Sequence, residues 1–242
     1  MSDQRALALR ALQLVDLTNL ADDPSEADID ALCAKASGDW GNVAAVCVWP
    51  QFVSRCRENL EGTDVLVATV TNFPAGSDNI DVAVAETRYA VADGADEVDV
   101  VFPYRAWLDG RHDVARALVE ACKDACGDDA HLKVIIETGE LKTPENIIGA
   151  SLDAINAGAD FIKTSTGKVD VSATPEACET MISVIKGSGL DIGFKAAGGI
   201  RTADDAALYL AIADRIMGPD WVSPANFRFG ASGLLDDLLS NL

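Results

Sequence analysis

The sequence predicts an α/β protein, a single (β/α)8 TIM barrel that occupies residues 1–242. Eight short runs rich in valine and isoleucine alternate with helical stretches, as expected of parallel strands buried on both faces. The length also suits this fold, which typically takes about 250 residues. An open, doubly wound sheet is the alternative, but no GxGxxG motif follows the first run.

The predicted strands are short, as strands of such barrels are, and they are spread evenly along the chain. In order they are Leu14–Leu17, Val43–Val48, Val65–Val70, Val98–Phe102, Leu132–Ile136, Phe161–Lys163, Gly193–Ala196 and Arg228–Gly230.

Helix boundaries between these strands are marked by capping residues. Thr143 and Thr174 each precede a proline and a glutamate, which is typical of a helix start with a threonine N-cap. Thr202 begins a stretch that resembles a capping box. Gly94 and Gly158 each supply the glycine that ends a helix just before a strand.

Charge and composition exclude several classes of function. The net charge is −20, from 39 acidic and 19 basic residues, so nucleic acid and anionic membranes would be repelled. An acidic, hydrated surface is the simple interpretation, and adaptation to a salty cytoplasm is a sharper hypothesis. No apolar run is long enough to cross a membrane, and the N-terminus lacks the basic start of a signal peptide. We therefore expect a cytoplasmic protein.

The cysteines and histidines argue against a metal site. Six cysteines are scattered without a CxxC pair, and only two histidines occur. We expect the cysteines to be free, buried thiols, and we expect neither a metal nor another cofactor.

Lys163 ends the predicted strand Phe161–Lys163, and the loop Thr164–Lys168 follows at once. A lysine at the end of a buried strand is costly to desolvate unless it is paired or neutral. A neutral lysine can attack a carbonyl group and form a Schiff base. The Ser/Thr/Gly loop with a second lysine, Lys168, suits an anion, so the sequence indicates a carbonyl substrate that also carries a phosphate.

Strand alternation places several charged side chains at one mouth of the barrel. If the polar members of each strand point inward, one end holds Asp16, Cys47, Asp99, Lys133, Lys163 and Lys195. A purely structural ion-pair network is the alternative, and Glu97 fits that role. As a group, however, the lysines outnumber the aspartates. Lys195 could lower the pKa of Lys163, and Asp99 could move protons between the amine and the substrate.

Glycine-rich loops follow three strands and form the candidate phosphate site. Such loops after the last strands of a barrel bind phosphate because backbone N–H groups can approach the oxygens. Each glycine pair alone could be an ordinary turn. The candidate residues are Gly167, Lys168, Gly198, Gly199, Arg201, Gly230 and Ser232.

At these positions the chain closely resembles class I deoxyribose-phosphate aldolases, the DeoC family. The resemblance covers nearly the whole chain and rests on Leu14–Thr18, Glu97–Pro103, Lys133–Thr138, Asp160–Gly167, Gly193–Lys195, Ala197–Arg201 and Gly230–Ser232.

The resemblance implies reversible cleavage of 2-deoxy-D-ribose 5-phosphate to D-glyceraldehyde 3-phosphate and acetaldehyde, in deoxyribose catabolism, by a possible homodimer. It implies that Lys163 forms the Schiff base and that Asp99 and Lys195 transfer protons. It also implies the substrate-binding and phosphate-binding residues, which would be Asp16, Thr18, Cys47, Lys133, Gly167, Lys168, Gly198, Gly199, Arg201, Gly230 and Ser232.

The chain departs from the family pattern at Ala196 and Gly233, where relatives often have proline and serine. Some relatives also extend into a tail that ends in a tyrosine, whereas this sequence ends at Leu242. We therefore expect proton exchange at the enamine either to be slower or to be handled by Asp99, Lys195 and water alone. Two other functions stay open. One is a class I lyase or transaldolase for a larger phosphosugar, and the other is a phosphosugar sensor without catalysis.

Overall fold

The computed structural model describes residues 3–242 and contains a closed parallel barrel, as predicted. Its strands follow the order β1-β10-β9-β8-β7-β6-β5-β4 around the barrel, so neighbours in sequence are neighbours in space. All eight predicted strands are present, with ends shifted by one or two residues. They are β1 (Val15–Asn19), β4 (Ala45–Val48), β5 (Leu66–Thr71), β6 (Glu97–Val101), β7 (His131–Ile135), β8 (Phe161–Lys163), β9 (Gly193–Ala197) and β10 (Phe227–Ala231).

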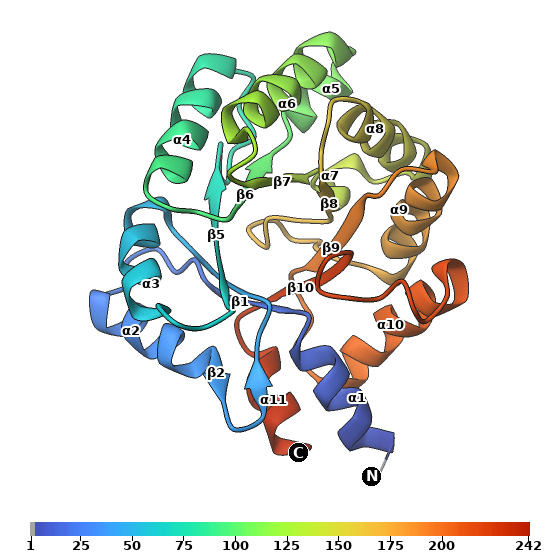
Figure 1. Cartoon of the computed structure of the whole chain (residues 1–242). Helices are drawn as coiled ribbons and strands as arrows, with labels where there is room; N and C mark the ends of the chain where they lie inside the picture. Colours follow the sequence, from blue (N-terminus) through green and yellow to red (C-terminus); the bar gives the residue numbers. More distant parts are fainter. Residues whose placement is uncertain (1–2) are drawn as a thin grey trace.

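Helices surround the strands and separate them along the chain (Figure 1). They are α1 (Asp3–Leu12), α2 (Glu26–Lys35), α3 (Val53–Asn59), α4 (Ile80–Ala92), α5 (Tyr104–Leu108), α6 (His112–Cys126), α7 (Thr138–Leu141), α8 (Pro144–Asn156), α9 (Pro175–Ser188), α10 (Ala203–Met217) and α11 (Leu234–Ser240), with the 3-10 helix η1 (Pro50–Phe52) before α3.

The predicted helix boundaries are confirmed. The side chains of Thr143, Thr174 and Thr202 each accept a backbone N–H of the first turn, in α8, α9 and α10 respectively. Gly94 and Gly158 have φ angles of 98° and 95° just beyond the ends of α4 and α8, where a side chain would be strained.

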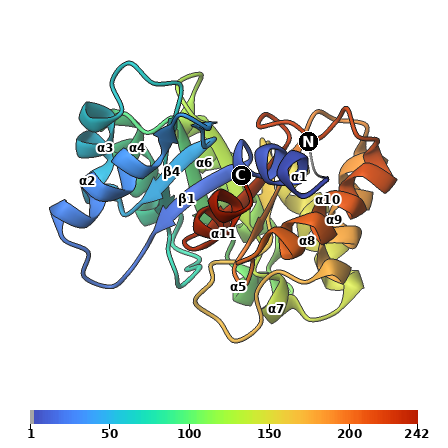
Figure 2. The same ribbon diagram turned by 90° about the horizontal axis from the view of Figure 1, so that it is seen from below.

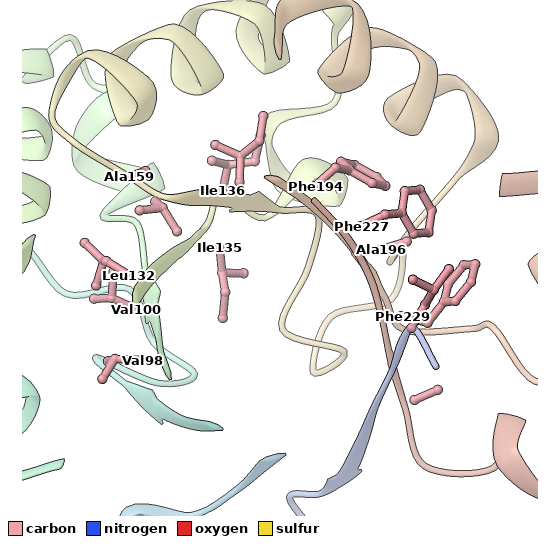
Figure 3. Close-up of a cluster of buried hydrophobic side chains, with 14 of the residues drawn as sticks. Val98, Val100, Leu132, Ile135, Ile136, Ala159, Phe194, Ala196, Phe227 and Phe229 are labelled. Atoms are coloured by element: carbon pink, nitrogen blue, oxygen red, sulfur yellow. The ribbon is translucent and has the colours of Figure 1, made fainter. Parts of the chain in front are cut away.

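The hydrophobic core fills the layer between barrel and helices. Phe194, Phe227 and Phe229 point from β9 and β10 toward the surrounding helices (Figure 3). Because side chains alternate along a strand, the residues between them point into the barrel, and these are Lys195 and Arg228. Packing of the apolar side chains outside the barrel therefore fixes the orientation of the charged side chains inside it.

A small hairpin, β2 (Ser37–Gly38) with β3 (Gly41–Asn42), is an addition that the sequence analysis did not predict. Its two-residue strands are too short to show an alternating apolar pattern. At the chain ends, α1 packs against α11, and the two helices lie side by side (Figure 2).

All six cysteines are buried and unpaired. Within residues 3–242 no helix is long and apolar enough to cross a membrane, and no group of three His, Cys, Asp or Glu side chains is placed to hold a metal ion.

Candidate active site

Charged side chains from six strands meet inside the barrel, and none is more than a few per cent exposed. Parallel pairing sets Lys163 beside Lys195, and Asp99 beside Lys133. The seven members of this interior charge cluster are Asp16, Glu97, Asp99, Lys133, Lys163, Lys195 and Arg228.

Asp99 is the centre of the interior charge cluster. Its Oδ2 accepts hydrogen bonds from the Nζ atoms of Lys163 and Lys195, each at 2.7 Å. Its Oδ1 accepts from Lys133 Nζ at 3.2 Å. The same carboxylate oxygen therefore joins the two lysines that the sequence analysis selected for chemistry.

A second layer holds Lys195 and Lys133 from below. Asp16 accepts a hydrogen bond from Lys195, and Arg228 Nη1 donates to the other oxygen of Asp16 at 2.7 Å. Glu97 accepts from Lys133 and, at 2.8 Å, from Arg228 Nη2. Glu97 has the structural pairing that was expected of it.

The environments of Lys163 and Lys195 push their pKa values in opposite directions. Burial lowers the pKa of Lys163, and the nearby charge of Lys195 lowers it further, against the pull of Asp99. Burial also acts to lower the pKa of Lys195, but Asp16 and Asp99 outweigh it and raise that pKa above its ordinary value. Lys195 is thus held as a cation, while Lys163 is the lysine that can lose its proton.

The number of charged groups in the interior charge cluster agrees with a neutral Lys163 and a protonated Lys195. The interior charge cluster has four basic groups and three carboxylates. Burial acts to raise the pKa of Asp99, yet its three lysines together hold that pKa well below the ordinary value, so it stays ionised. With the carboxylates ionised, a neutral Lys163 brings the cluster to charge balance.

A cavity of about 630 Å³ opens above Lys163 at the carboxyl ends of the strands. Lys163 is 3% exposed and forms part of its lining. Most of the predicted phosphate-site residues also line it, namely Thr18, Gly167, Lys168, Gly198, Gly199, Arg201, Gly230 and Ser232.

The other predicted site residues lie beneath this cavity. Asp16 and Lys133 are fully buried in the interior charge cluster, and Cys47 is 1% exposed. Lys133 therefore does not line the cavity in the way that a phosphate contact would. Burial raises the pKa of the Cys47 thiol, so it stays neutral.

Close packing of loops shapes the cavity wall at Gly198. Its φ angle is 85°, and a Cβ there would lie 2.5 Å from the Cβ of Ser172. Only glycine meets both conditions, and the adjacent backbone can then approach a ligand.

Lys168 spans the mouth of the cavity. Its Nζ donates to the carbonyl oxygen of Leu20 at 2.9 Å and lies 3.3 Å from Asp22 Oδ1, both in the loop after β1. The lysine that was expected to hold an anion is thus tied across the opening in this state.

An apolar cluster of side chains adjoins the interior charge cluster on the β4–β5 side. Ala45, Cys47, Ala68 and Val70 are buried together, and Phe73 packs against them. The rings of Phe73 and Trp49 meet edge to face at 5.5 Å. The surroundings of Cys47 are therefore closely packed and apolar.

The sequence analysis did not select two buried charged residues of this region. Arg228 was placed in a predicted strand, and its spacing of two from Gly230 could have shown that it faces inward. Glu137 lies in the stretch Lys133–Thr138 that carries the resemblance but was given no role, and it is fully buried. Ala196 and Gly233 are the two residues that depart from the family pattern. Ala196 is buried on the helix-facing side of β9, and Gly233 is the N-cap of α11.

A family model described as DeoC/LacD family aldolase matches residues 10–237. The chain belongs to the DeoC/LacD family of aldolases. It is therefore a carbon–carbon lyase of the class I aldolase type, consistent with a buried lysine at the centre of the site.

Solved structures similar to this aldolase cover nearly all of the chain. A candidate deoxyribose-phosphate aldolase from Coccidioides immitis is 33% identical, covers 97% of this chain and 87% of its own, and has a TM-score of 0.84. A candidate deoxyribose-phosphate aldolase from Toxoplasma gondii is 26% identical with a TM-score of 0.90, and the match covers 98% of this chain and 97% of that one. The tetrameric deoxyribose phosphate aldolase from Aeropyrum pernix is 27% identical with a TM-score of 0.78, and the match covers 99% and 92%.

Proposed function

We propose that this aldolase cleaves 2-deoxy-D-ribose 5-phosphate reversibly to D-glyceraldehyde 3-phosphate and acetaldehyde. The observation that carries the proposal is the pairing of Lys163 and Lys195 through one oxygen of Asp99, directly below the cavity. The names of the similar structures support the same substrate.

The first half of the proposed reaction forms an imine. The neutral amine of Lys163 attacks the aldehyde carbon, C1, of the open-chain sugar. The two protons of the amine move in turn, by way of Asp99, to the former carbonyl oxygen, which leaves as water. Lys195 keeps Asp99 in place and donates to it, so that proton transfer occurs over hydrogen-bond distances.

The second half uses the imine as an electron sink. Removal of the proton on the C3 hydroxyl breaks the C2–C3 bond, and its electron pair becomes the double bond of an enamine on Lys163. The C3–C5 fragment leaves as D-glyceraldehyde 3-phosphate. Protonation of the enamine at C2 and hydrolysis release acetaldehyde and restore the free amine, so all atoms are accounted for.

The phosphate would lie among the loops that line the cavity. Gly198 and Gly199, with φ angles of 85° and 86°, let the backbone approach its oxygens, while Lys168 and Arg201 supply positive charge. A local positive potential is needed here because the whole chain carries −20 charges. Lys168 must leave Leu20 and Asp22 to make this contact.

The apolar surroundings of Cys47 favour a two-carbon donor. Alanine, valine and aromatic side chains are packed there beside the interior charge cluster, and such side chains suit the methyl group of acetaldehyde rather than a hydroxylated carbon. These apolar side chains therefore favour the proposed reaction over that of a lyase or transaldolase that acts on a larger phosphosugar.

Trapping of the imine tests the proposal. The protein is incubated with acetaldehyde, reduced with borohydride and digested, and the modified residue is identified by mass spectrometry. We expect a two-carbon adduct on Lys163, loss of the adduct and of turnover in Lys163→Ala, and retention of the adduct in Lys168→Ala, which leaves the amine intact. An adduct only with larger ketones would favour the alternative lyase. Tight phosphosugar binding without any adduct would favour a sensor.

Two further expectations belong to this proposal. The six free, buried thiols are consistent with work in a reducing compartment such as the cytoplasm. The homodimer implied by the resemblance stays a prediction, which light scattering on the purified protein can check.

A further inference from the structure

Glu137 is a buried carboxyl group that contacts the loop after Lys163 and has no basic partner. It is fully buried, and none of the ion pairs among residues 3–242 includes it. Burial raises its pKa, and the hydrogen bond from Thr166 opposes that rise, as does the charge of Lys163. A carboxyl group buried in this way is costly, so its retention calls for a physical reason.

The backbone around Glu137 is held in an uncommon conformation. Glu137 has φ 58° and ψ 64°, in the left-handed region that a residue with a side chain rarely adopts. On either side of it, the N–H groups of Ile136 and Thr138 donate to the carbonyl oxygens of Lys163 and Thr164, at 3.0 and 2.9 Å. The segment is thereby fixed against the strand end that carries Lys163.

The turn that follows is equally constrained. A Cβ on Gly139 would lie 1.9 Å from the carbonyl oxygen of Val171, in the loop between β8 and α9. The glycine therefore allows the turn after Glu137 to pack directly against the loop between β8 and α9.

The carboxylate of Glu137 reaches back to the loop after Lys163. The Thr166 N–H donates to Oε1 at 3.1 Å and lies 3.4 Å from Oε2. The Thr166 hydroxyl in turn accepts the N–H of Lys168 at 3.0 Å. Gly167, between them, lines the cavity with φ 78°. A continuous set of contacts thus runs from Glu137 to the lysine at the cavity mouth.

We propose that Glu137 is a positioning residue that sets the affinity of the cavity for the phosphate end of the substrate. It acts through Thr166, whose orientation determines where the N–H of Gly167 and the side chain of Lys168 point. This inference rests on the proposed function for the identity of the sugar, but the phosphate contact can be tested separately.

Kinetics with two matched substrates test this role. In Glu137→Ala we expect KM for 2-deoxyribose 5-phosphate to rise about tenfold, the fold-change typical of losing one hydrogen bond to a charged group. KM for unphosphorylated 2-deoxyribose and trapping of acetaldehyde on Lys163 should stay unchanged. Glu137→Gln keeps an acceptor for Thr166 and should restore most of the affinity. Glu140→Ala, in the same turn but without a contact to the loop, is the control.

Binding of inorganic phosphate, followed by its phosphorus NMR signal, gives a readout that does not depend on turnover. The same order should appear: weaker binding in Glu137→Ala, and little change in Glu137→Gln and Glu140→Ala. If Glu137→Ala does not fold, the variant Glu137→Asp takes its place in both assays, because the shorter side chain withdraws the carboxylate from Thr166. The inference would be overturned if the Glu137 variant lost affinity equally for both sugars, or if the folded variant bound phosphate as tightly as the wild type. Failure of the proposed function would instead appear as wild-type protein that binds phosphate but does not cleave the sugar.

Discussion

Replacing Asp99 with asparagine should separate imine formation from turnover. Among residues 3–242, Asp99 is the one carboxylate that pairs with Lys163, whereas Lys133 retains Glu97 and Lys195 retains Asp16. Asparagine keeps the shape of the side chain and removes its charge. The protonated form of Lys163 therefore loses its carboxylate partner, while Lys133 and Lys195 each keep one.

The strength of the attraction between Asp99 and protonated Lys163 follows from the distance between them. Two unit charges 2.7 Å apart attract by about 6 kcal/mol at an effective dielectric constant of about 20. Without this attraction, burial and Lys195 act unopposed, and the pKa of Lys163 falls further. The amine then stays neutral at lower pH, so trapping of acetaldehyde at equilibrium should extend to more acidic solution than in the wild type.

Turnover should respond in the opposite way. Loss of a positioned acid–base group typically slows a reaction about 10²- to 10⁴-fold, and we expect a decrease of this size in the release of glyceraldehyde 3-phosphate, measured with a coupled dehydrogenase. Glu97→Gln is the matched control, because it also removes a buried carboxylate but does not touch Lys163. Trapping that moves to higher pH in folded Asp99→Asn, or turnover within tenfold of wild type, would refute the reasoning.

Three further predictions concern stability. Arg228→Met removes one of the two basic hydrogen-bond partners of both Asp16 and Glu97 and leaves an oxygen of each buried carboxylate unpaired, so it should destabilise the fold by about 3–5 kcal/mol in urea titrations; an unchanged midpoint would contradict this. Thr202→Ala removes the N-cap of α10 and should cost about 1 kcal/mol, with Ser as the variant that restores it. Because the net charge is −20, molar potassium chloride should raise the melting temperature by screening repulsion, and no rise would count against salt adaptation.

Much of the fold could be predicted because its signals are local. Each strand is a short apolar run, and each of Thr143, Thr174 and Thr202 marks a helix start through its own hydrogen bond. Sequence periodicity also gave the inward faces of the strands that carry Asp99, Lys163 and Lys195, which placed these three residues together. The β2–β3 hairpin was missed because two-residue strands carry no period.

The candidate site was less completely predictable because its details depend on distances between strands. The sequence showed that lysines and aspartates share a face, but not that one oxygen of Asp99 serves both Lys163 and Lys195. Arg228 was missed because it stands at the start of its predicted strand, where the inward face was not counted. Glu137 was missed because its role depends on a left-handed backbone and on Thr166, which lies 29 positions away.

The interior charge cluster also restricts how this barrel can change over generations. A substitution that removes one of its charges takes one of two or more ion pairs from each neighbour and unbalances the buried charge, so single steps at Asp16, Glu97, Lys133 or Arg228 lower stability even though these residues lie below the cavity. Two substitutions made together, one acidic and one basic, would avoid that intermediate. The loops around the cavity carry no such coupling at Arg201 or Ser232, which are exposed. New substrate preferences should therefore arise by drift in the loops, while the interior charges are inherited as a set.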